Sequence, residues 1–408
     1  MNSFFPSVLV ALLITASAVE AAPGVVVSLA SVGDRVRAQN PDLAAARLRI
    51  REALGRMNQS GRLANPEIET EVRHDAHYRE RGLEIGFIQR FPMTNRLRLE
   101  KDVSVAEYKV SEAEVREVER QIIAEAREGV INVLAIRQRR ELLNQQSALS
   151  KEFADFLSSV AEKGEGSRLD AGQAKLEAAG LALEMRQLDA SEVAAIGTLK
   201  PLLGMLPAES LLVSGSLPSP AIPAAGVNHA RRPDYQAAVL QADAAAKGVA
   251  LEQAKRYDDV EAGIFAGAEK TEDAPEGYDK ETMVGLRFKF PLPLWNKNEG
   301  AIQEAQALKE RRNKEADALA RSIHLEAEAA RAEMAEWSKL LGELDGTLIP
   351  LAEEQAKAAE DAFRQGQGEI QTVFRNREKR LQLAAAKLDA LQQFHLARVR
   401  HEAASGKP

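Results

Sequence analysis

Asn40-Pro41-Asp42-Leu43 opens an alanine-rich helical stretch that leads into strand-like patterning, Phe91-Pro92 and a very long helical run. Arg232-Pro233-Asp234-Tyr235 opens the same order of events, which passes through Phe290-Pro291. A pattern that returns after about two hundred residues indicates a duplicated unit. The sequence therefore predicts two copies of one unit, each joining short strands to long helices.

Segments of different composition frame these units. The first unit is expected at residues 22–200 and the second at residues 231–404. Between them lies a linker, residues 201–230, that is rich in Pro, Ser and Gly. Residues 405–408 are left as a C-terminal tail.

Residues 1–21 are expected to be a signal peptide. An apolar run from Phe4 to Ile14 precedes small residues, with acceptable cleavage points after Ala18 and after Ala21. No Lys or Arg comes before the run, so an uncleaved anchor is the alternative. Beyond this leader no stretch of roughly twenty apolar residues occurs, so a membrane would have to be crossed by strands.

Composition excludes several classes of function. The formal net charge of -7 is spread along helix faces, with no basic stripe that would follow the phosphates of a nucleic acid. The chain has no Cys, which removes disulfides, thiolate metal sites and a lipid-modified N-terminal cysteine. Aromatic residues make up only 5% of the chain, which favours extended helix packing over a compact core.

Four segments of about nine residues alternate apolar and polar side chains, as strands do. They are expected at residues 66–74 and 82–91 in the first unit and at residues 260–268 and 282–290 in the second. Each is near the length that crosses a bilayer at a tilt, although soluble β-hairpins would show the same alternation. Four strands cannot close a barrel in lipid, whereas three chains supply twelve, a number within the range of closed membrane barrels.

The helical runs are far longer than a compact domain needs. From about Leu99 to Glu162 no Pro interrupts a stripe of apolar residues at heptad-like spacing. A similar stripe extends from about Lys297 to Gln365, with a local bend expected at Pro350. Each run would span roughly 95 to 100 Å.

The shorter helices match these lengths if they stack end to end in pairs. The expected pairs are residues 40–63 with 169–200, and residues 233–256 with 369–404. Each pair would reach about 85 to 90 Å. A coiled-coil scaffold would explain the apolar stripes, but it explains neither the stacking nor the strands.

Several motifs carry a resemblance to a known family. They are Asn40-Pro41-Asp42-Leu43-Ala44-Ala45-Ala46-Arg47, Asn65-Pro66-Glu67-Ile68, Arg232-Pro233-Asp234, Gly164 followed by Asp170, Ala174 and Lys175, and Phe363-Arg364-Gln365-Gly366 followed by Ile370. In these motifs the chain resembles the TolC family of bacterial outer-membrane efflux proteins, and more narrowly its CzcC-like branch. The resemblance covers essentially the whole chain after the leader.

The resemblance implies a mainly α fold with a small β part. The long coiled-coil helices of a homotrimer would form a periplasmic α-barrel, and four strands per protomer would contribute to a 12-stranded outer-membrane β-barrel. The protein would be a passive export channel rather than an enzyme, without cofactors. Its partners would be outer-membrane lipid, a periplasmic adaptor (membrane fusion) protein and an inner-membrane pump of the RND type.

The resemblance also assigns residues at the two helical turns, near residues 163–168 and 364–369. Adaptor docking is expected at Gly164, Glu165, Gly166, Ser167, Gly366, Gln367, Gly368 and Glu369. The entrance constriction is expected at Arg168, Asp170, Thr372 and Arg375, although Thr372 stands where the family often has Asp. Glycine also ends ordinary helical hairpins, but its repetition in both halves favours the functional interpretation.

No arrangement of residues indicates catalysis. His74-Asp75-Ala76-His77 is the one dense group of metal-ligating side chains, and a solvated loop explains it better than a metal site. The Gly86-Phe87-Ile88-Gln89-Arg90-Phe91-Pro92 segment has a CzcC-like character, which favours divalent metal ions as cargo, with a drug or another small molecule as the alternative. The alternative from another class is a periplasmic coiled-coil adaptor or structural protein that does not span the outer membrane.

Overall fold

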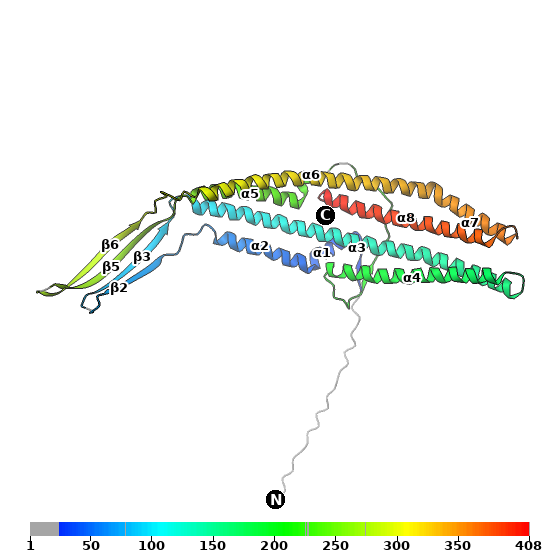
Figure 1. The fold of residues 1–408 in the computed structure, drawn as a ribbon, viewed down its shortest axis with the longest axis horizontal. Helices are drawn as coiled ribbons and strands as arrows, with labels where there is room; N and C mark the ends of the chain where they lie inside the picture. Colours follow the sequence, from blue (N-terminus) through cyan, green and yellow to red (C-terminus); the bar gives the residue numbers. More distant parts are fainter. Residues whose placement is uncertain (1–23, 78, 225, 227, 274, 408) are drawn as a thin grey trace, which may run out of the picture.

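The fold is elongated, with a sheet at one end, two helical hairpin turns at the other and long helices between (Figure 1). The computed structural model describes residues 24–77, 79–224, 226, 228–273 and 275–407. The signal peptide expected at residues 1–21 lies outside this part of the chain.

The elements follow one another along the chain in two similar series. The first series comprises β1 (Val25–Val27), α1 (Val32–Gln39), α2 (Pro41–Gln59), β2 (Glu67–His74), β3 (Arg81–Phe91), α3 (Arg96–Glu162) and α4 (Arg168–Leu202). The linker holds β4 (Leu211–Val213) and a short 3₁₀ turn, His229–Arg231. The second series comprises α5 (Pro233–Ala254), β5 (Val260–Asp273), β6 (Gly277–Lys289), α6 (Glu299–Glu343), a π-helical turn (Leu344–Leu348), α7 (Ile349–Arg364) and α8 (Ile370–Ala404).

The four long strands form one antiparallel sheet in the order β2-β3-β5-β6. One rung of its register joins Ile68, Phe87, Ile264 and Leu286, and all four side chains are exposed. Because side chains alternate along a strand, Glu69 and the neighbouring Arg287, which form an ion pair, lie on the other face. The sheet is therefore apolar on one face and charged on the other.

Two of the predicted strand ranges were wrong at their outer ends. The strand expected at residues 260–268 continues to Asp273, and the one expected at 282–290 begins at Gly277. Charged residues such as Lys270 and Glu281 replace the apolar alternation there, so the sequence pattern ends before the backbone pairing does.

Stacked helices run beside the long ones, as Figure 1 shows. α3 is 67 residues long and spans about 100 Å. α2 and α4 lie along it one after the other, and α5 and α8 follow α6 and α7 in the same way. The bend expected at Pro350 coincides with the π-helical turn, directly before α7, since Pro350 supplies no N–H for a regular helical hydrogen bond.

Glycines make the junctions where stacked helices meet. Gly204 ends α4 with a left-handed φ of 65°, and a Cβ placed there would lie 2.0 Å from the carbonyl oxygen of Gln39, next to the start of α2. Asn40 closes the same junction: its side chain accepts a hydrogen bond from the N–H of Leu43 and donates one to the carbonyl of Leu202. Gly406 (φ 69°) ends α8 against Arg232 in the second unit.

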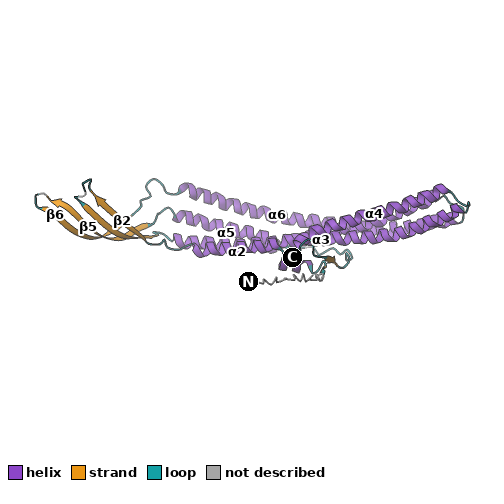
Figure 2. Ribbon diagram, turned by 90° about the horizontal axis from the view of Figure 1, so that it is seen from below, coloured by secondary structure: helices purple, strands orange, loops and turns teal. Residues whose placement is uncertain are grey.

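A small collar lies at mid-length on one side of the helices (Figure 2). There β1 pairs in parallel with β4, which joins residue 25 to residue 211. Val27, Val32 and Val36 pack with Ile131 and Leu199 into the main apolar core of the described residues. The sequence interpretation had treated the linker as irregular and missed this pairing.

Along the part of the chain that the structure describes, no helix is both long enough and apolar enough to cross a bilayer.

Candidate functional site at the hairpin tips

Both helical hairpins turn with the same hydrogen-bond pattern. At the first tip the N–H of Gly164 bonds the carbonyl of Ala161 at 3.1 Å, and the N–H of Glu165 bonds that of Val160 at 3.0 Å. At the second tip Gly366 and Gln367 make the equivalent bonds, at 3.0 and 2.9 Å. Gly164 and Gly366 have φ values of 78° and 73°, the left-handed conformation of a Schellman motif.

The residues after each turn begin the returning helix. The Ser167 hydroxyl accepts a hydrogen bond from the N–H of Asp170 at 3.3 Å and so caps α4. Glu369 precedes α8 without a side-chain cap. A Cβ at Gly166 would lie 2.9 Å from the Val160 side chain, and one at Gly368 would lie 3.1 Å from the backbone of Phe363, so both turns are tightly folded.

The four residues expected at the constriction lie close to these turns but not against one another in one chain. Arg168, Thr372 and Arg375 are exposed and Asp170 is half-buried. The ion pairs of this region join Glu360 with Arg364 and Arg377, and neither Asp170 nor Arg375 takes part in them. A contact between Asp170 and Arg375 within one protomer, the simplest form of the expectation, is therefore absent from the described residues.

Arg377, which the sequence interpretation missed, joins the two hairpins instead. Its side chain is 13% exposed and forms a 3.0 Å ion pair with Glu360 of α7. Its guanidinium also lies 4.3 Å from the ring centre of Phe153 on α3. Burial alone would raise the pKa of Glu360, but the hydrogen bond from Arg377 and the charges of Arg377 and Arg364 bring it below its usual value.

An aromatic cluster surrounds this arginine. Phe153 meets the rings of Phe363 and Phe374 edge to face, with centroids 6.1 and 6.0 Å apart. Ile370 and Val373 of α8 pack with Ala171 and Ala174 of α4 in the same apolar core. The two hairpins are thus held together near their tips by apolar packing around one buried charge.

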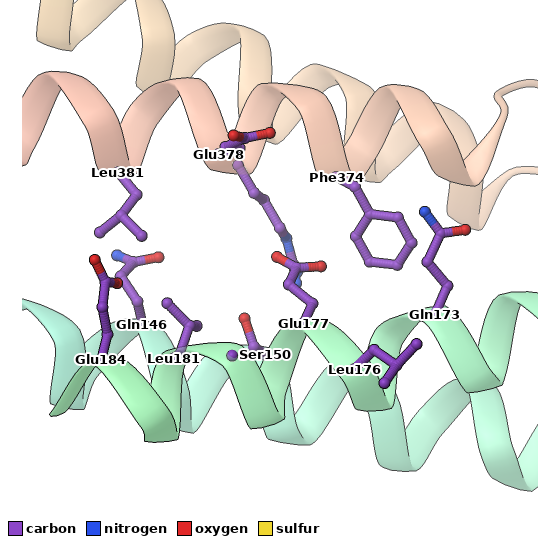
Figure 3. A pocket seen from close by; sticks show the side chains of 12 residues that line it. Gln146, Ser150, Gln173, Leu176, Glu177, Leu181, Glu184, Phe374, Glu378 and Leu381 are labelled. Atoms are coloured by element: carbon purple, nitrogen blue, oxygen red, sulfur yellow. The ribbon is translucent and has the colours of Figure 1, made fainter. Parts of the chain in front are cut away.

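A cleft of about 440 Å³ opens between α4 and α8 behind the tips (Figure 3). Leu176, Leu181 and Leu381 line it together with polar side chains from three helices. Glu177 extends into it from α4, opposite Glu378 of α8 (Figure 3). Burial raises the pKa of Glu177, Arg377 opposes this shift, and Glu378 adds to it.

The sequence did carry a signal for Arg377. Ile370, Val373, Phe374 and Leu381 follow the 3.6-residue period of a buried helix face, and Arg377 occupies a position on that face. A charged residue on an apolar stripe indicates a buried partner, which Glu360 supplies.

The histidine group on the β2–β3 loop makes no comparable site. His74 and His77 are exposed. In the described ranges no three His, Asp or Glu side chains are placed to hold a metal ion.

A comparison with known protein families agrees with this architecture. Residues 32–205, which are essentially the first unit, match the model of the outer membrane efflux protein family. Over these residues the chain is similar to outer membrane efflux proteins. The narrower CzcC-like branch stays a prediction. No curated protein matches the sequence.

Solved structures of outer-membrane and transmembrane-channel proteins share the fold of this chain. CusC aligns with a TM-score of 0.78 at 13% identity, over 93% of this chain and 92% of its own. VceC of Vibrio cholerae aligns with a TM-score of 0.74 at 17% identity, over 93% of this chain and 96% of its own. MtrE of Neisseria gonorrhoeae aligns with a TM-score of 0.74 at 14% identity, over 93% of this chain and 89% of its own. The sheet, the stacked helices and both tips therefore form an architecture that these solved structures share.

The similarity of residues 32–205 to outer membrane efflux proteins indicates the orientation of the molecule. The strands belong in the outer membrane and the helices in the periplasm. The ends of β2, β3, β5 and β6 that lie far from the helices accordingly face the cell exterior (Figure 1).

Proposed function

We propose that three copies of this chain form a passive export duct in the outer membrane. The observation that carries the proposal is the pair of open sheet edges, β2 on one side and β6 on the other. Lipid does not tolerate unpaired backbone groups, so β6 of one copy must pair with β2 of the next. Three copies give a closed set of twelve strands, and the stacked helices below them would close a tube in the same order.

The duct would work within a tripartite efflux system. An inner-membrane pump of the RND type supplies the energy, and a periplasmic adaptor protein connects it to the tips. Adaptor docking is proposed at the two turns, Gly164–Ser167 and Gly366–Glu369, which share one backbone geometry and present exposed glycines. The shared geometry would let one adaptor element engage both turns.

Divalent metal ions are the proposed cargo. This part of the proposal rests on the CzcC-like character of residues 86–92 alone. Transport of a radioactive divalent ion by cells with and without the gene would test it, and unchanged retention of the ion would exclude this cargo.

The oligomeric state is tested directly by native mass measurement in detergent. A complex of roughly three chain masses is expected for a closed β-barrel, and on a gel it should migrate more slowly before heating than the monomer that heating releases. A monomer that keeps its full β content would contradict the proposal. The backbone hydrogen-bonding groups of the edge strands β2 and β6 would then be paired without a second copy of the chain.

The entrance is proposed to close through charges that meet only between copies. Asp170 and Arg375 are not paired within a chain, so an ionic contact would have to join neighbouring protomers. Such a pair near water contributes about 0 to 1 kcal/mol, so opening needs little work.

Planar-bilayer conductance tests this closure. Asp170→Ala, Arg375→Ala and the double variant are expected to conduct more than wild type, and Lys379→Ala, which removes an exposed charge on the same helix, is not. Equal conductance of all four proteins would remove these residues from the constriction.

A further inference from the structure

One rung of the sheet places basic residues opposite one another on all four strands. The register joins His74 of β2 to Arg81 of β3, Arg81 to Lys270 of β5, and Lys270 to Lys280 of β6. Like charges directly opposite each other disfavour pairing of the strands. Arg81, Lys270 and Lys280 therefore concentrate positive charge at one level of the sheet.

This row lies on the apolar face of the sheet. Residues 74, 81, 270 and 280 have the same parity as the exposed rung of Ile68, Phe87, Ile264 and Leu286, so their side chains leave the sheet on the same side. Val72 and Leu83 occupy the next rung on this face. In the membrane, this is the face that meets lipid.

Carboxylates at the same level lie mainly on the opposite face. The neighbouring rung carries Glu269 opposite Glu281, one residue along from the cations, and alternation directs both away from the apolar side. Glu272 lies on the same side as the row, but it forms a 3.4 Å ion pair with another cation, Arg79. On this face the basic side chains outnumber the acidic ones.

The position of the row matches the depth of a bilayer. Arg81 and Phe91 are ten positions apart on β3, and Lys280 and Phe290, next to β6, are also ten positions apart. At about 3.3 Å per residue and the usual strand tilt, this is roughly 25 Å along the membrane normal, the height of the apolar band of an outer-membrane barrel. Phe91 and Phe290 are exposed at the periplasmic end of this band, and the cations mark its outer end.

Tyr278 adds an aromatic residue just outside the row. The ammonium group of Lys270 lies 3.7 Å from the centre of its ring, and the tyrosine is 52% exposed. Tyrosine is typical of the level where lipid headgroups begin. The lysine is thus held at the height at which headgroup phosphates lie.

We propose that His74, Arg81, Lys270 and Lys280 form a binding row for phosphorylated lipid headgroups of the outer leaflet. The inference rests on the proposed function, because it requires the sheet to lie in the outer membrane as part of a closed barrel. In a trimer the row repeats three times and becomes a basic ring around the barrel. Phosphate oxygens accept charge-assisted hydrogen bonds from lysine and arginine and relieve the repulsion along the rung.

The test compares lipid-dependent stabilisation of purified trimers. Wild type and Lys270→Gln/Lys280→Gln are heated in neutral detergent with a diphosphorylated glycolipid or with the same glycolipid after dephosphorylation. The midpoint of trimer dissociation is read from gel migration at increasing lipid concentration. A third arm uses soluble pyrophosphate, which separates a lipid site from a site for free phosphate.

Wild type is expected to be stabilised by the diphosphorylated lipid alone. Removing both lysines should weaken its apparent affinity about 25-fold, which is roughly fivefold for each cation near an anionic surface. The control is Arg73→Gln/Lys289→Gln, which removes two cations from the opposite face of the same sheet and should bind lipid as wild type does.

Each other outcome overturns the proposal. The row does not bind lipid phosphate if both glycolipids stabilise the trimer equally or if the double lysine variant keeps its affinity for the lipid. The same conclusion follows if pyrophosphate stabilises the trimer as much as the lipid does. If wild type forms conducting trimers but shows any of these results, the inference alone fails. If wild type neither trimerises nor inserts into lipid, the proposed function fails with it.

Discussion

At the scale of the residue, glycine decides whether stacked helices can meet. Gly204 combines a left-handed φ with a carbonyl oxygen 2.0 Å from where a Cβ would stand. Any side chain would therefore move the end of α4 away from the start of α2. The neighbouring Asn40 would then lose the carbonyl of Leu202, to which it donates.

We expect Gly204→Ala to destabilise the protein by more than about 2 kcal/mol, because both the φ and the contact oppose a Cβ. Gly180→Ala is the control: it lies within α4 with open space around it and should stabilise the protein slightly. Thermal midpoints of the purified proteins give the comparison. Equal midpoints would show that the junction yields without strain.

A second effect at the residue scale depends on pH. His395 is 1% exposed, and its Nε2 lies 2.9 Å from the carbonyl of Pro218, which fixes the linker to α8. Burial lowers the pKa of His395 below its usual 6.5. Because the depressed pKa belongs to the folded state, the unfolded chain takes up a proton first as the pH falls.

Stability should therefore be complete above about pH 6.5 and fall as the pH drops below it. His395→Gln, which keeps a donor without a titrating group, should flatten this dependence between pH 7.5 and 5.5. Thermal unfolding across this range measures the effect. An identical slope in both proteins would assign the pH dependence to other groups.

At the scale of the element, the two hairpins are joined near their tips by Arg377. Removing its charge leaves Glu360 half-buried with only Arg364 as partner, and the stacking on Phe153 is lost. We expect Arg377→Met to destabilise the tip by about 1 to 3 kcal/mol. Arg375→Met changes an exposed side chain two positions away and should stay within about 0.5 kcal/mol.

Amide hydrogen exchange measures this locally. Faster exchange in α7 and α8 near the tip is expected for Arg377→Met and not for Arg375→Met. If the two variants exchange alike, apolar packing alone holds the hairpins together.

Much of the secondary structure could be predicted from the periodicity of apolar residues and from residues that interrupt helices. The apolar stripe between Leu99 and Glu162 predicted α3, and Pro350 predicted the break before α7. Pairings between distant residues could not be predicted, because nothing local encodes them. The β1–β4 pair joins positions 25 and 211, and three-residue strands show no alternation to recognise.

The same distinction applies to the candidate site. Gly164 and Gly366 were predicted at the turns, because a left-handed residue at a helix end is a local requirement. Whether Asp170 and Arg375 meet depends on how chains assemble, which no local rule decides. Arg377 was missed because its partners come from α3 and α7, although its place on an apolar stripe of α8 was visible.

At the scale of the whole molecule, the proposed trimer would use each chain as one segment of a ring. The sheet ends in β2 on one side and β6 on the other, and these edges are different surfaces. A contact between two different surfaces of identical copies repeats until the ring closes. The number of copies is therefore set by the curvature of the sheet and helices rather than by any symmetric patch.

The two unequal edges also have a genetic consequence. A chain whose β6 edge is blocked by a proline keeps its β2 edge, so it can join a growing ring but never let it close. If the protein forms the proposed trimer and blocked and normal chains are expressed equally, only about one ring in eight would contain three normal copies. The blocked allele should therefore be strongly dominant, whereas a chain that fails to fold at all should be recessive, and export measured in cells carrying both alleles would tell the two apart.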